Sequence, residues 1–189
     1  MTAAVRKLSA TGGFWAAAAA LTASAGEGPE PANCDGISET PAWMRGMKPP
    51  PGARLLPQIK LMVLIARRPD ISSDEFHRYW LENHAALALS VADEVRLQRY
   101  VQSHEVPSVI AEGYAGTRGW TPNIFEGVTE AWWNSEQDMI EAFSTPAGMA
   151  ISQRLVEDEN RFCDQRCVGI IMREYAIFDR DRNRDGQAS

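Results

Sequence analysis

Several features that define whole classes of protein are scarce or missing in this sequence of 189 residues. Only three cysteines and three histidines are present, and no Cys-x-x-Cys pair or Cys/His cluster has the spacing of a zinc site. A phosphate-cradling glycine motif, a nucleophile elbow and a His-Glu-x-x-His sequence are also missing. The sequence therefore predicts neither a disulfide framework nor a metal site.

A clustered excess of positive charge is missing as well. The 19 lysines and arginines are outnumbered by 25 acidic residues, which gives a formal net charge of -6 and an isoelectric point near 5.1. Nucleic acids and anionic lipid surfaces attract clustered lysine and arginine, so neither a nucleic acid nor a membrane is a predicted partner. The hydrophobic content of 44% is enough for the core of one folded domain.

The N-terminal part resembles a leader and a linker more than a packed element. Residues 1–25 combine early basic residues, a short alanine-rich apolar run and an Ala-Ser-Ala sequence, which is the outline of an export signal, although a disordered extension also fits. Residues 26–57 are rich in glycine, proline and glutamate. We expect the domain to cover 58–178 and a disordered tail to cover 179–189. A cytoplasmic location is favoured unless residues 1–25 are a signal peptide.

The remaining sequence predicts an α+β domain with a ferredoxin-like, four-stranded antiparallel sheet. The order strand, helix, strand, strand, helix pair, strand is the split βαβ pattern. Residues 107–123, with two prolines and three glycines, are predicted to be a long loop that acts as a lid or a binding loop. The apolar patterns place strands at 59–67, 95–105, 125–134 and 168–178, and helices at 74–89, 135–143 and 146–162.

Three of the four predicted strands are apolar on both alternating faces, but helices on this plan cover only one face of the sheet. The open face therefore needs a partner. A second copy of the chain, packed sheet to sheet, is the economical solution, so we expect a homodimer. The alternative is a monomer whose open face is covered by its own linker or by the loop at 107–123.

The helix predicted at 74–89 carries two of the three histidines. His77 and His84 are seven residues apart and project from nearly the same face, with Trp80 between them. His77 fits a hydrogen-bonded structural group. His84 fits either that role or a side chain aimed into a pocket, because the small residues at 85–86 would let the helix bend. The predicted strand at 95–105 adds a polar face that includes Tyr100 and His104.

Two other groups are expected to have no chemical role. Cys163 and Cys167 fit two unrelated, partly buried thiols, since a free cysteine mostly behaves as a small hydrophobic residue. The acidic run Glu157, Asp158 and Glu159 fits a solvated helix face.

The residues at 58–178 resemble the EthD family of the dimeric α/β barrel superfamily. The resemblance is carried by KLMVLIARRPDISSDEFHRYWLENHAALA, GVTEAWWNSEQDMIEAFSTPAG and EDENRFCD. It implies a cavity between sheet and helices in each subunit, no metal or organic cofactor, and chemistry such as lactone isomerisation, polyketide cyclisation, dehydration or decarboxylation. His84 matches the histidine of the YW...H pattern and Tyr100 a polar pocket position. Trp132 stands where an isomerase-like relative has a cysteine, so a thiol-dependent mechanism is not implied.

Our first functional hypothesis is a cofactor-independent lyase, isomerase or cyclase acting on a small aromatic, polyketide-like or lactone substrate. His84 would be the catalytic base and Tyr100 would donate a hydrogen bond to the developing oxyanion. The alternatives are a non-catalytic small-molecule binding or accessory protein of a degradation pathway, and a haem protein that uses His84 as its ligand. The predicted substrate-binding residues are Trp132, Trp80, His104, Trp120 and Tyr114.

Overall fold

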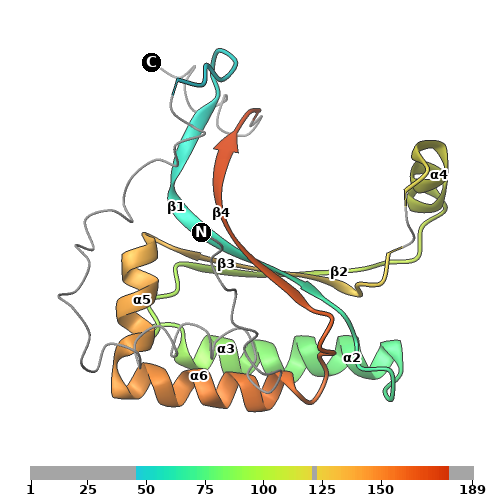
Figure 1. Ribbon diagram of the computed structural model, residues 1–189. Coiled ribbons are helices and arrows are strands. Elements are labelled where there is room, and N and C mark those ends of the chain that lie inside the picture. Colours follow the sequence, from blue (N-terminus) through green and yellow to red (C-terminus); the bar gives the residue numbers. More distant parts are fainter. Residues whose placement is uncertain (1–45, 121–122, 179–189) are drawn as a thin grey trace, which may run out of the picture.

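The computed structural model describes residues 46–120 and 123–178 (Figure 1). The predicted leader at 1–25 and the predicted tail at 179–189 lie outside these residues. The elements in chain order are β1 (Arg54–Ile65), α2 (Ser73–Tyr79), the π-helical segment η3 (Trp80–His84), α3 (Ala85–Val91), β2 (Arg99–His104), α4 (Val109–Arg118), β3 (Gly127–Trp133), α5 (Glu136–Ser144), α6 (Pro146–Glu159) and β4 (Val168–Ala176).

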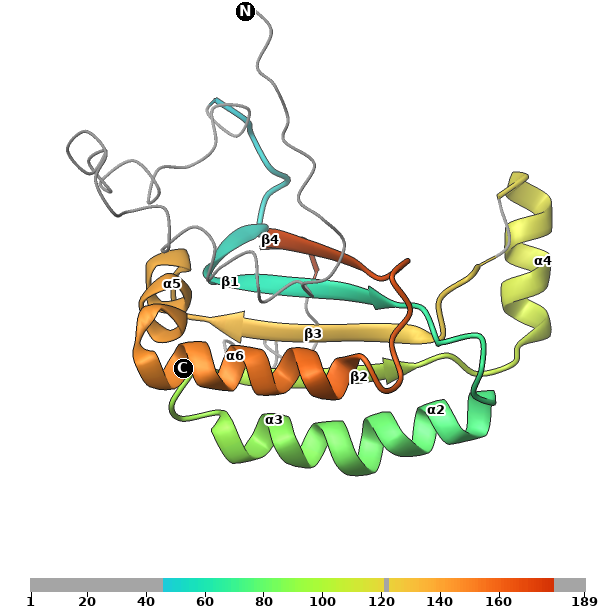
Figure 2. The ribbon, with the colours of Figure 1, turned by 60° about the horizontal axis from the view of Figure 1, so that its bottom comes forward.

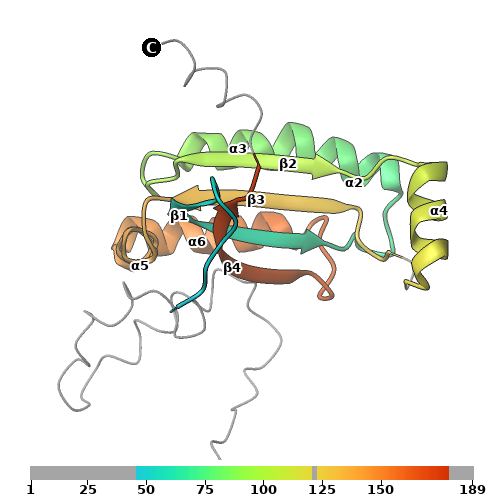
Figure 3. The same cartoon turned by 90° about the horizontal axis from the view of Figure 1, so that it is seen from above.

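The four strands form one antiparallel sheet in the order β2-β3-β1-β4. The helix α2–η3–α3 and the helix α6 run side by side over one face of this sheet (Figure 2). From the opposite side the strands lie in front of these helices, and no described helix covers the sheet there (Figure 3). The predicted α+β, ferredoxin-like fold is confirmed, and the sheet of a single subunit is open rather than a closed barrel.

The predicted amphipathic helix contains a π-helical turn. It begins with a capping box, in which the Ser72 side chain accepts from the backbone N–H of Glu75 and the Glu75 carboxylate accepts from that of Ser72. At Trp80–His84 the backbone hydrogen bonds join residues five apart instead of four, so that the N–H of Ala85 donates to the carbonyl of Trp80. The Gln102 side chain from β2 donates to the same carbonyl at 3.0 Å. This turn is where the helix changes the direction of its side chains, and His84 is its last residue.

Three predicted elements differ from the structure. The first strand begins at Arg54, inside the stretch predicted to be a linker, rather than at Ile59. The second strand begins at Arg99 rather than near Val95, because residues 92–98 form a turn in which Arg96 has a left-handed φ of 55°. The predicted loop at 107–123 contains the helix α4. Ser108 caps its N-terminus, and Gly119 with φ of 62° ends it. In α4 no residue is buried, and the helix stands away from the sheet and the other helices (Figure 1).

The core lies between the sheet and the helix layer. One cluster centres on Ile59, Leu61 and Trp133, and the other on Phe76, Trp80 and Phe162. The Trp133 indole donates to the carbonyl of Val95 at 2.7 Å, which satisfies its only polar group. Of the helices within 46–120 and 123–178, none is long and apolar enough to cross a membrane.

Candidate active site

A cavity of about 550 Å³ lies between the sheet and the helix layer. That volume is in the range that holds a small organic molecule. Most of its wall is apolar, and it includes Leu61 and Val63 from β1 and Trp133 from β3. Other parts of the wall come from β2, η3, α3, α5, α6 and the connection that follows α6. The polar residues of the wall include His84, Tyr100, Thr129, Glu159 and Asn160.

His84 reaches the cavity wall from the last position of the π-helical turn and is 6% exposed. Its Nδ1 atom lies 2.8 Å from Oδ2 of Asp158, which belongs to α6. The other carboxylate oxygen of Asp158 accepts a hydrogen bond of 2.6 Å from the hydroxyl of Tyr79. Two side chains from one helix are therefore held by a single carboxylate from the neighbouring helix.

The protonation of this pair follows from the carboxylate. Burial acts to raise the pKa of Asp158, but the hydrogen bonds from His84 and Tyr79 outweigh burial, and the pKa is lower than that of an ordinary aspartate. An ionised carboxylate can only accept hydrogen bonds, so the Nδ1 atom of His84 carries the proton. In the neutral form of the ring the Nε2 atom bears the lone pair, and the hydrogen bond to Asp158 uses Nδ1 and not Nε2. His84 is arranged as a base at the cavity wall.

Tyr100 lies on the helix-covered face of β2 and also lines the cavity. Its ring centroid is 6.4 Å from that of His84. Burial raises the pKa of Tyr100, so the phenol is neutral at physiological pH. The Gln102 amide donates to the phenol oxygen at 3.1 Å, and Thr129 and Trp80 are further hydrogen-bonding neighbours that act to lower the pKa of Tyr100. A phenol keeps its own proton as a donor, so Tyr100 could donate a hydrogen bond to a molecule beside His84.

A chain of polar side chains continues from Tyr100 toward the surface. Gln102 contacts His104 at 3.2 Å, and His104 contacts His77 through their Nδ1 atoms at 2.8 Å. His77 in turn lies 3.5 Å from the carboxylate of Glu126. The prediction that His77 is a hydrogen-bonded group is confirmed. His104 also packs on Trp80 at 4.2 Å between ring centroids, so it supports the cavity wall without lining it.

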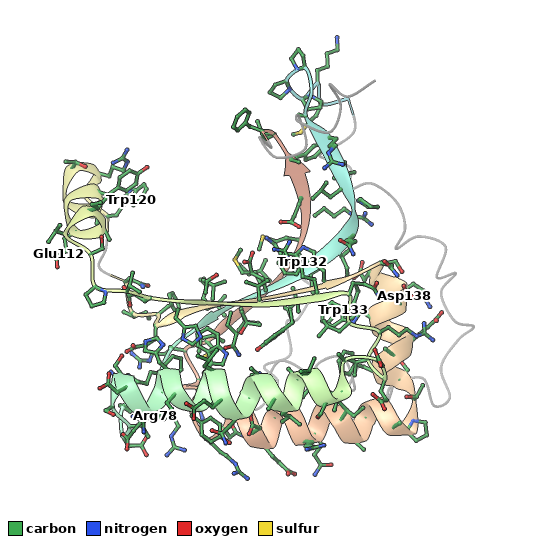
Figure 4. All side chains as sticks on the ribbon, turned by 180° about the vertical axis from the view of Figure 1, so that it is seen from behind. Arg78, Glu112, Trp120, Trp132, Trp133 and Asp138 are labelled. Atoms are coloured by element: carbon green, nitrogen blue, oxygen red, sulfur yellow. The ribbon has the colours of Figure 1, made fainter. Side chains whose placement is uncertain are left out.

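The structure separates the predicted substrate-binding aromatic residues. Trp80 is fully buried and lines the cavity. Trp132 lies on the opposite face of the sheet, where its indole donates to Glu174 at 2.6 Å and packs under Arg99 (Figure 4). Tyr114 lies in α4 and Trp120 just after it, and their ring centroids are 5.4 Å apart. Trp120 is seen beside α4, away from the sheet (Figure 4). Trp132, Tyr114 and Trp120 therefore do not line the cavity of this subunit.

Sequence reasoning missed two members of the site. Asp158 was expected to be solvated, yet it is part-buried and bonded to His84. Its position is a usable signal, because it follows Leu155 by three residues and precedes Phe162 by four, on the inward face of α6. Trp133 rather than Trp132 faces the cavity, since the register places Trp133 opposite Ile59 of the core. Within 46–120 and 123–178, no cluster of three His, Cys, Asp or Glu residues could hold a metal ion.

Comparison with known proteins identifies a family. A family model described as EthD domain matches residues 68–166. An EthD family protein from Bacillus halodurans is 17% identical over 62% of this chain and 98% of its own, with a TM-score of 0.43. A hydroxynitrile lyase from Passiflora edulis is 10% identical over 66% and 100%, with a TM-score of 0.45. A mutant of SnoaB, a cofactor-independent oxygenase from Streptomyces nogalater, is 11% identical over 62% and 92%, with a TM-score of 0.38. A search of curated proteins found no match.

Proposed function

This chain belongs to the EthD family, and we propose that it is a cofactor-independent lyase, isomerase or cyclase that moves a proton on a small, largely apolar substrate. The observation that carries this proposal is the bonded pair of His84 and Asp158 at the wall of an apolar cavity. Imidazole is the side chain most often used for general acid–base catalysis near neutral pH. The carboxylate fixes its tautomer and would stabilise the imidazolium that forms when it accepts a proton.

The proposed chemical step is the removal of a proton from a carbon next to a carbonyl group. The Nε2 atom of His84 takes the proton, and the electron pair of the broken C–H bond moves to the carbonyl oxygen. Tyr100 donates a hydrogen bond to that oxygen, and its developing charge makes this hydrogen bond stronger than in the ground state. Return of the proton to another atom gives isomerisation, whereas loss of a leaving group gives a lyase reaction.

The cavity supports an aromatic, polyketide-like or lactone substrate as the chemical class. Its walls include the aromatic rings of Trp133, Phe143 and Phe162, and its volume of about 550 Å³ suits a molecule of one to three fused rings. Two of its polar groups, His84 and Tyr100, are neighbours in the wall, with ring centroids 6.4 Å apart. A substrate with one polar edge and an apolar body therefore fits this arrangement.

The test uses a probe that reports a base in an apolar pocket without knowledge of the natural substrate. 5-Nitrobenzisoxazole loses its C3 proton to a base, its N–O bond breaks, and a coloured phenolate forms. We expect the purified chain to accelerate this elimination, and His84→Gln to lose at least about tenfold of the acceleration. Asp158→Asn should lose less of the rate acceleration than His84→Gln, because an amide can still orient the imidazole ring but carries no charge.

The matched control is Tyr114→Phe, which removes a hydroxyl from an aromatic residue outside the cavity and should leave the rate unchanged. A wild-type rate equal to that of buffer, with the probe bound equally by wild type and His84→Gln, would favour the non-catalytic binding or accessory role. A Soret band on adding haem that His84→Gln abolishes would favour the haem-binding alternative.

We also propose that two copies associate through the open face of the sheet. This face carries Val168 and Ile170, which are 43% and 44% exposed, beside the partly buried Met62 and Leu64. Contiguous apolar side chains on the uncovered face of a sheet favour burial against a second surface, and pairing of identical faces closes with two-fold symmetry. Sedimentation velocity that finds only monomer at micromolar concentration would contradict this assembly.

A further inference from the structure

Two cysteines that the proposed chemistry does not use lie together at the cavity wall. Cys163 follows α6 and Cys167 precedes β4. The chain between them folds back, because the N–H of Cys167 donates to the carbonyl of Asp164 at 3.2 Å. Both cysteines are attached to the end of β1: Cys163 pairs with Arg67 in an isolated bridge, and the N–H of Ala66 lies 3.2 Å from the sulfur of Cys167. Both also line the cavity.

The two cysteines pack against the same buried cluster, which includes Phe76, Trp80 and Phe162. A hydrogen bond from the Cys163 thiol to the sulfur of Cys167 is the largest cause of the pKa shifts of both groups, so the expectation of two unrelated thiols is wrong. The sulfur of Cys167 also lies 3.5 Å from the carbonyl oxygen of Ala66. The turn explains the difference, since four residues of helix would have kept the two sulfurs on successive turns, whereas the turn at Asp164 brings them together. The hydrogen bond from Cys163 lowers the pKa of Cys167, and the same contact raises the pKa of Cys163. One thiol is thereby favoured as a thiolate beside a protonated partner.

We propose that Cys163 and Cys167 form a redox pair that closes reversibly to an intramolecular disulfide at the cavity wall, with a hydroperoxide as the oxidant. The Cys167 thiol gives its proton to solvent, its thiolate attacks one oxygen of hydrogen peroxide, and the O–O bond breaks. A sulfenic acid and hydroxide form, and the hydroxide takes up the released proton to give water. The sulfur of Cys163 then attacks the sulfenic sulfur, loses its proton and expels a second water. Two thiols and one hydrogen peroxide thus give one disulfide and two waters, and an external dithiol reverses the reaction.

The position of the pair connects this oxidation with the proposed active site. The connection that holds the cysteines also contributes Phe162, Asp164 and Gln165 to the cavity wall. A disulfide between its two ends would restrain this part of the wall, and a molecule in the cavity would shield both sulfurs from the oxidant. The pair is therefore a modification site that responds to peroxide and to occupancy of the cavity.

The experiment uses the full chain with Cys34→Ser, so that only Cys163 and Cys167 are left. After mild hydrogen peroxide treatment, we expect both thiols to disappear together when counted under denaturing conditions. The intact mass should fall by two hydrogen atoms, and dithiothreitol should restore both thiols. Peptide mapping should place the bond between the two cysteines. Independent loss of single thiols, oxidation to sulfinic acid alone, or disulfides only between chains would overturn the proposal.

Phenylarsine oxide tests the proximity of the thiols without any oxidation. The trivalent arsenic forms two As–S bonds with a neighbouring dithiol and releases one water. Removal of either sulfur turns two-point binding into one-point binding, so Cys163→Ser and Cys167→Ser, each in the Cys34→Ser chain, should weaken binding by at least about tenfold. Equal binding by the Cys34→Ser chain and by both double variants would show that the sulfurs do not act as a pair. Circular dichroism verifies that each variant is folded.

Discussion

The two faces of the sheet hold their polar groups in opposite ways. On the helix-covered face, Tyr100, Gln102 and His104 form a chain of neutral hydrogen-bonding groups that ends beside the cavity. On the open face, Lys60 lies between Glu130 and Glu174, at 2.8 Å and 2.7 Å from their carboxylates. Neutral donors and acceptors suit a site that exchanges protons with a ligand. A compact ion cluster beside Trp132, on a face that also carries aliphatic side chains, suits a surface that meets another protein surface.

The proposed chemistry and the proposed assembly use different faces of the same strands. Successive residues of a strand alternate between the faces, so neighbours such as Trp132 and Trp133 take part in different environments. A substitution on one face can therefore test that face while its neighbour serves as the control.

The largest expected effect is on self-association. Ile170→Asp places a carboxylate on the open face, and two-fold symmetry would bury that charge twice in a dimer. Burial of an unpaired charge costs several kcal/mol, so we expect the dimer dissociation constant to rise by at least about 100-fold, measured by sedimentation velocity. Ile171→Asp is the matched control, because Ile171 is similarly exposed, at 41% against 44%, but points to the helix-covered side. Equal effects of the two variants would remove the assignment of the open face as the interface.

A medium effect is expected from Lys60→Met, which leaves Glu130 and Glu174 without their cation. Because the two glutamate side chains are still 22% and 27% exposed and partly screened by solvent, we expect a loss of about 1–2 kcal/mol in the free energy of unfolding. Urea denaturation measures this loss. Arg96→Met, which breaks an exposed ion pair with Glu141, should cost less.

The same substitution has a predictable pH dependence. Burial favours the uncharged amine, but the hydrogen bonds and charges of Glu130 and Glu174 outweigh burial and raise the pKa of Lys60 above 10.5. A raised pKa means that the stabilisation is fully present below pH 10.5 and is lost as the pH rises through the pKa of the folded state. The difference in the free energy of unfolding between wild type and Lys60→Met should therefore be constant near neutral pH and shrink in the alkaline range. A difference in this free energy that grows at alkaline pH would contradict the role given to Lys60.

Much of the fold could be predicted because its signals are local. The apolar pattern at 74–89 identified the first helix, and the order of elements then identified the sheet. The spacing of seven residues placed His84 on the same face of that helix as His77. The helix α4 was missed because its glycines and flanking prolines are typical of loops, while the caps Ser108 and Gly119 support a short helix.

The site was harder to predict because its contacts join distant segments. Asp158 meets His84 across 74 residues of sequence, and only the packing of α6 beside η3 brings them together. The choice between Trp132 and Trp133 depended on strand register, since a shift of one residue exchanges the two faces of a strand. The contact of Cys163 with Cys167 depended on a turn that the spacing alone does not show. Sequence patterns indicated which elements form, whereas the partners of each polar side chain followed from their packing.

The smallest expected effect concerns the helix-covered face in mild acid. Burial, and then the charge that His77 can carry, lower the pKa of His104 below 6.5, and Glu126 faces His77 from the other side. Because the pKa of His104 is lower in the folded state than in the unfolded state, the unfolded state binds a proton first as the pH falls. The free energy of unfolding is therefore full above pH 6.5 and decreases as the pH falls from 6.5 toward the pKa of the folded state. Urea denaturation at pH 7.5 and pH 5.5 should show a shallow acid loss for wild type that His104→Gln reduces. Lys60→Met should lose as much unfolding free energy between pH 7.5 and pH 5.5 as wild type does, because Lys60 stays charged throughout this range. If Lys60→Met reduced this acid loss as much as His104→Gln does, the two faces would not titrate separately.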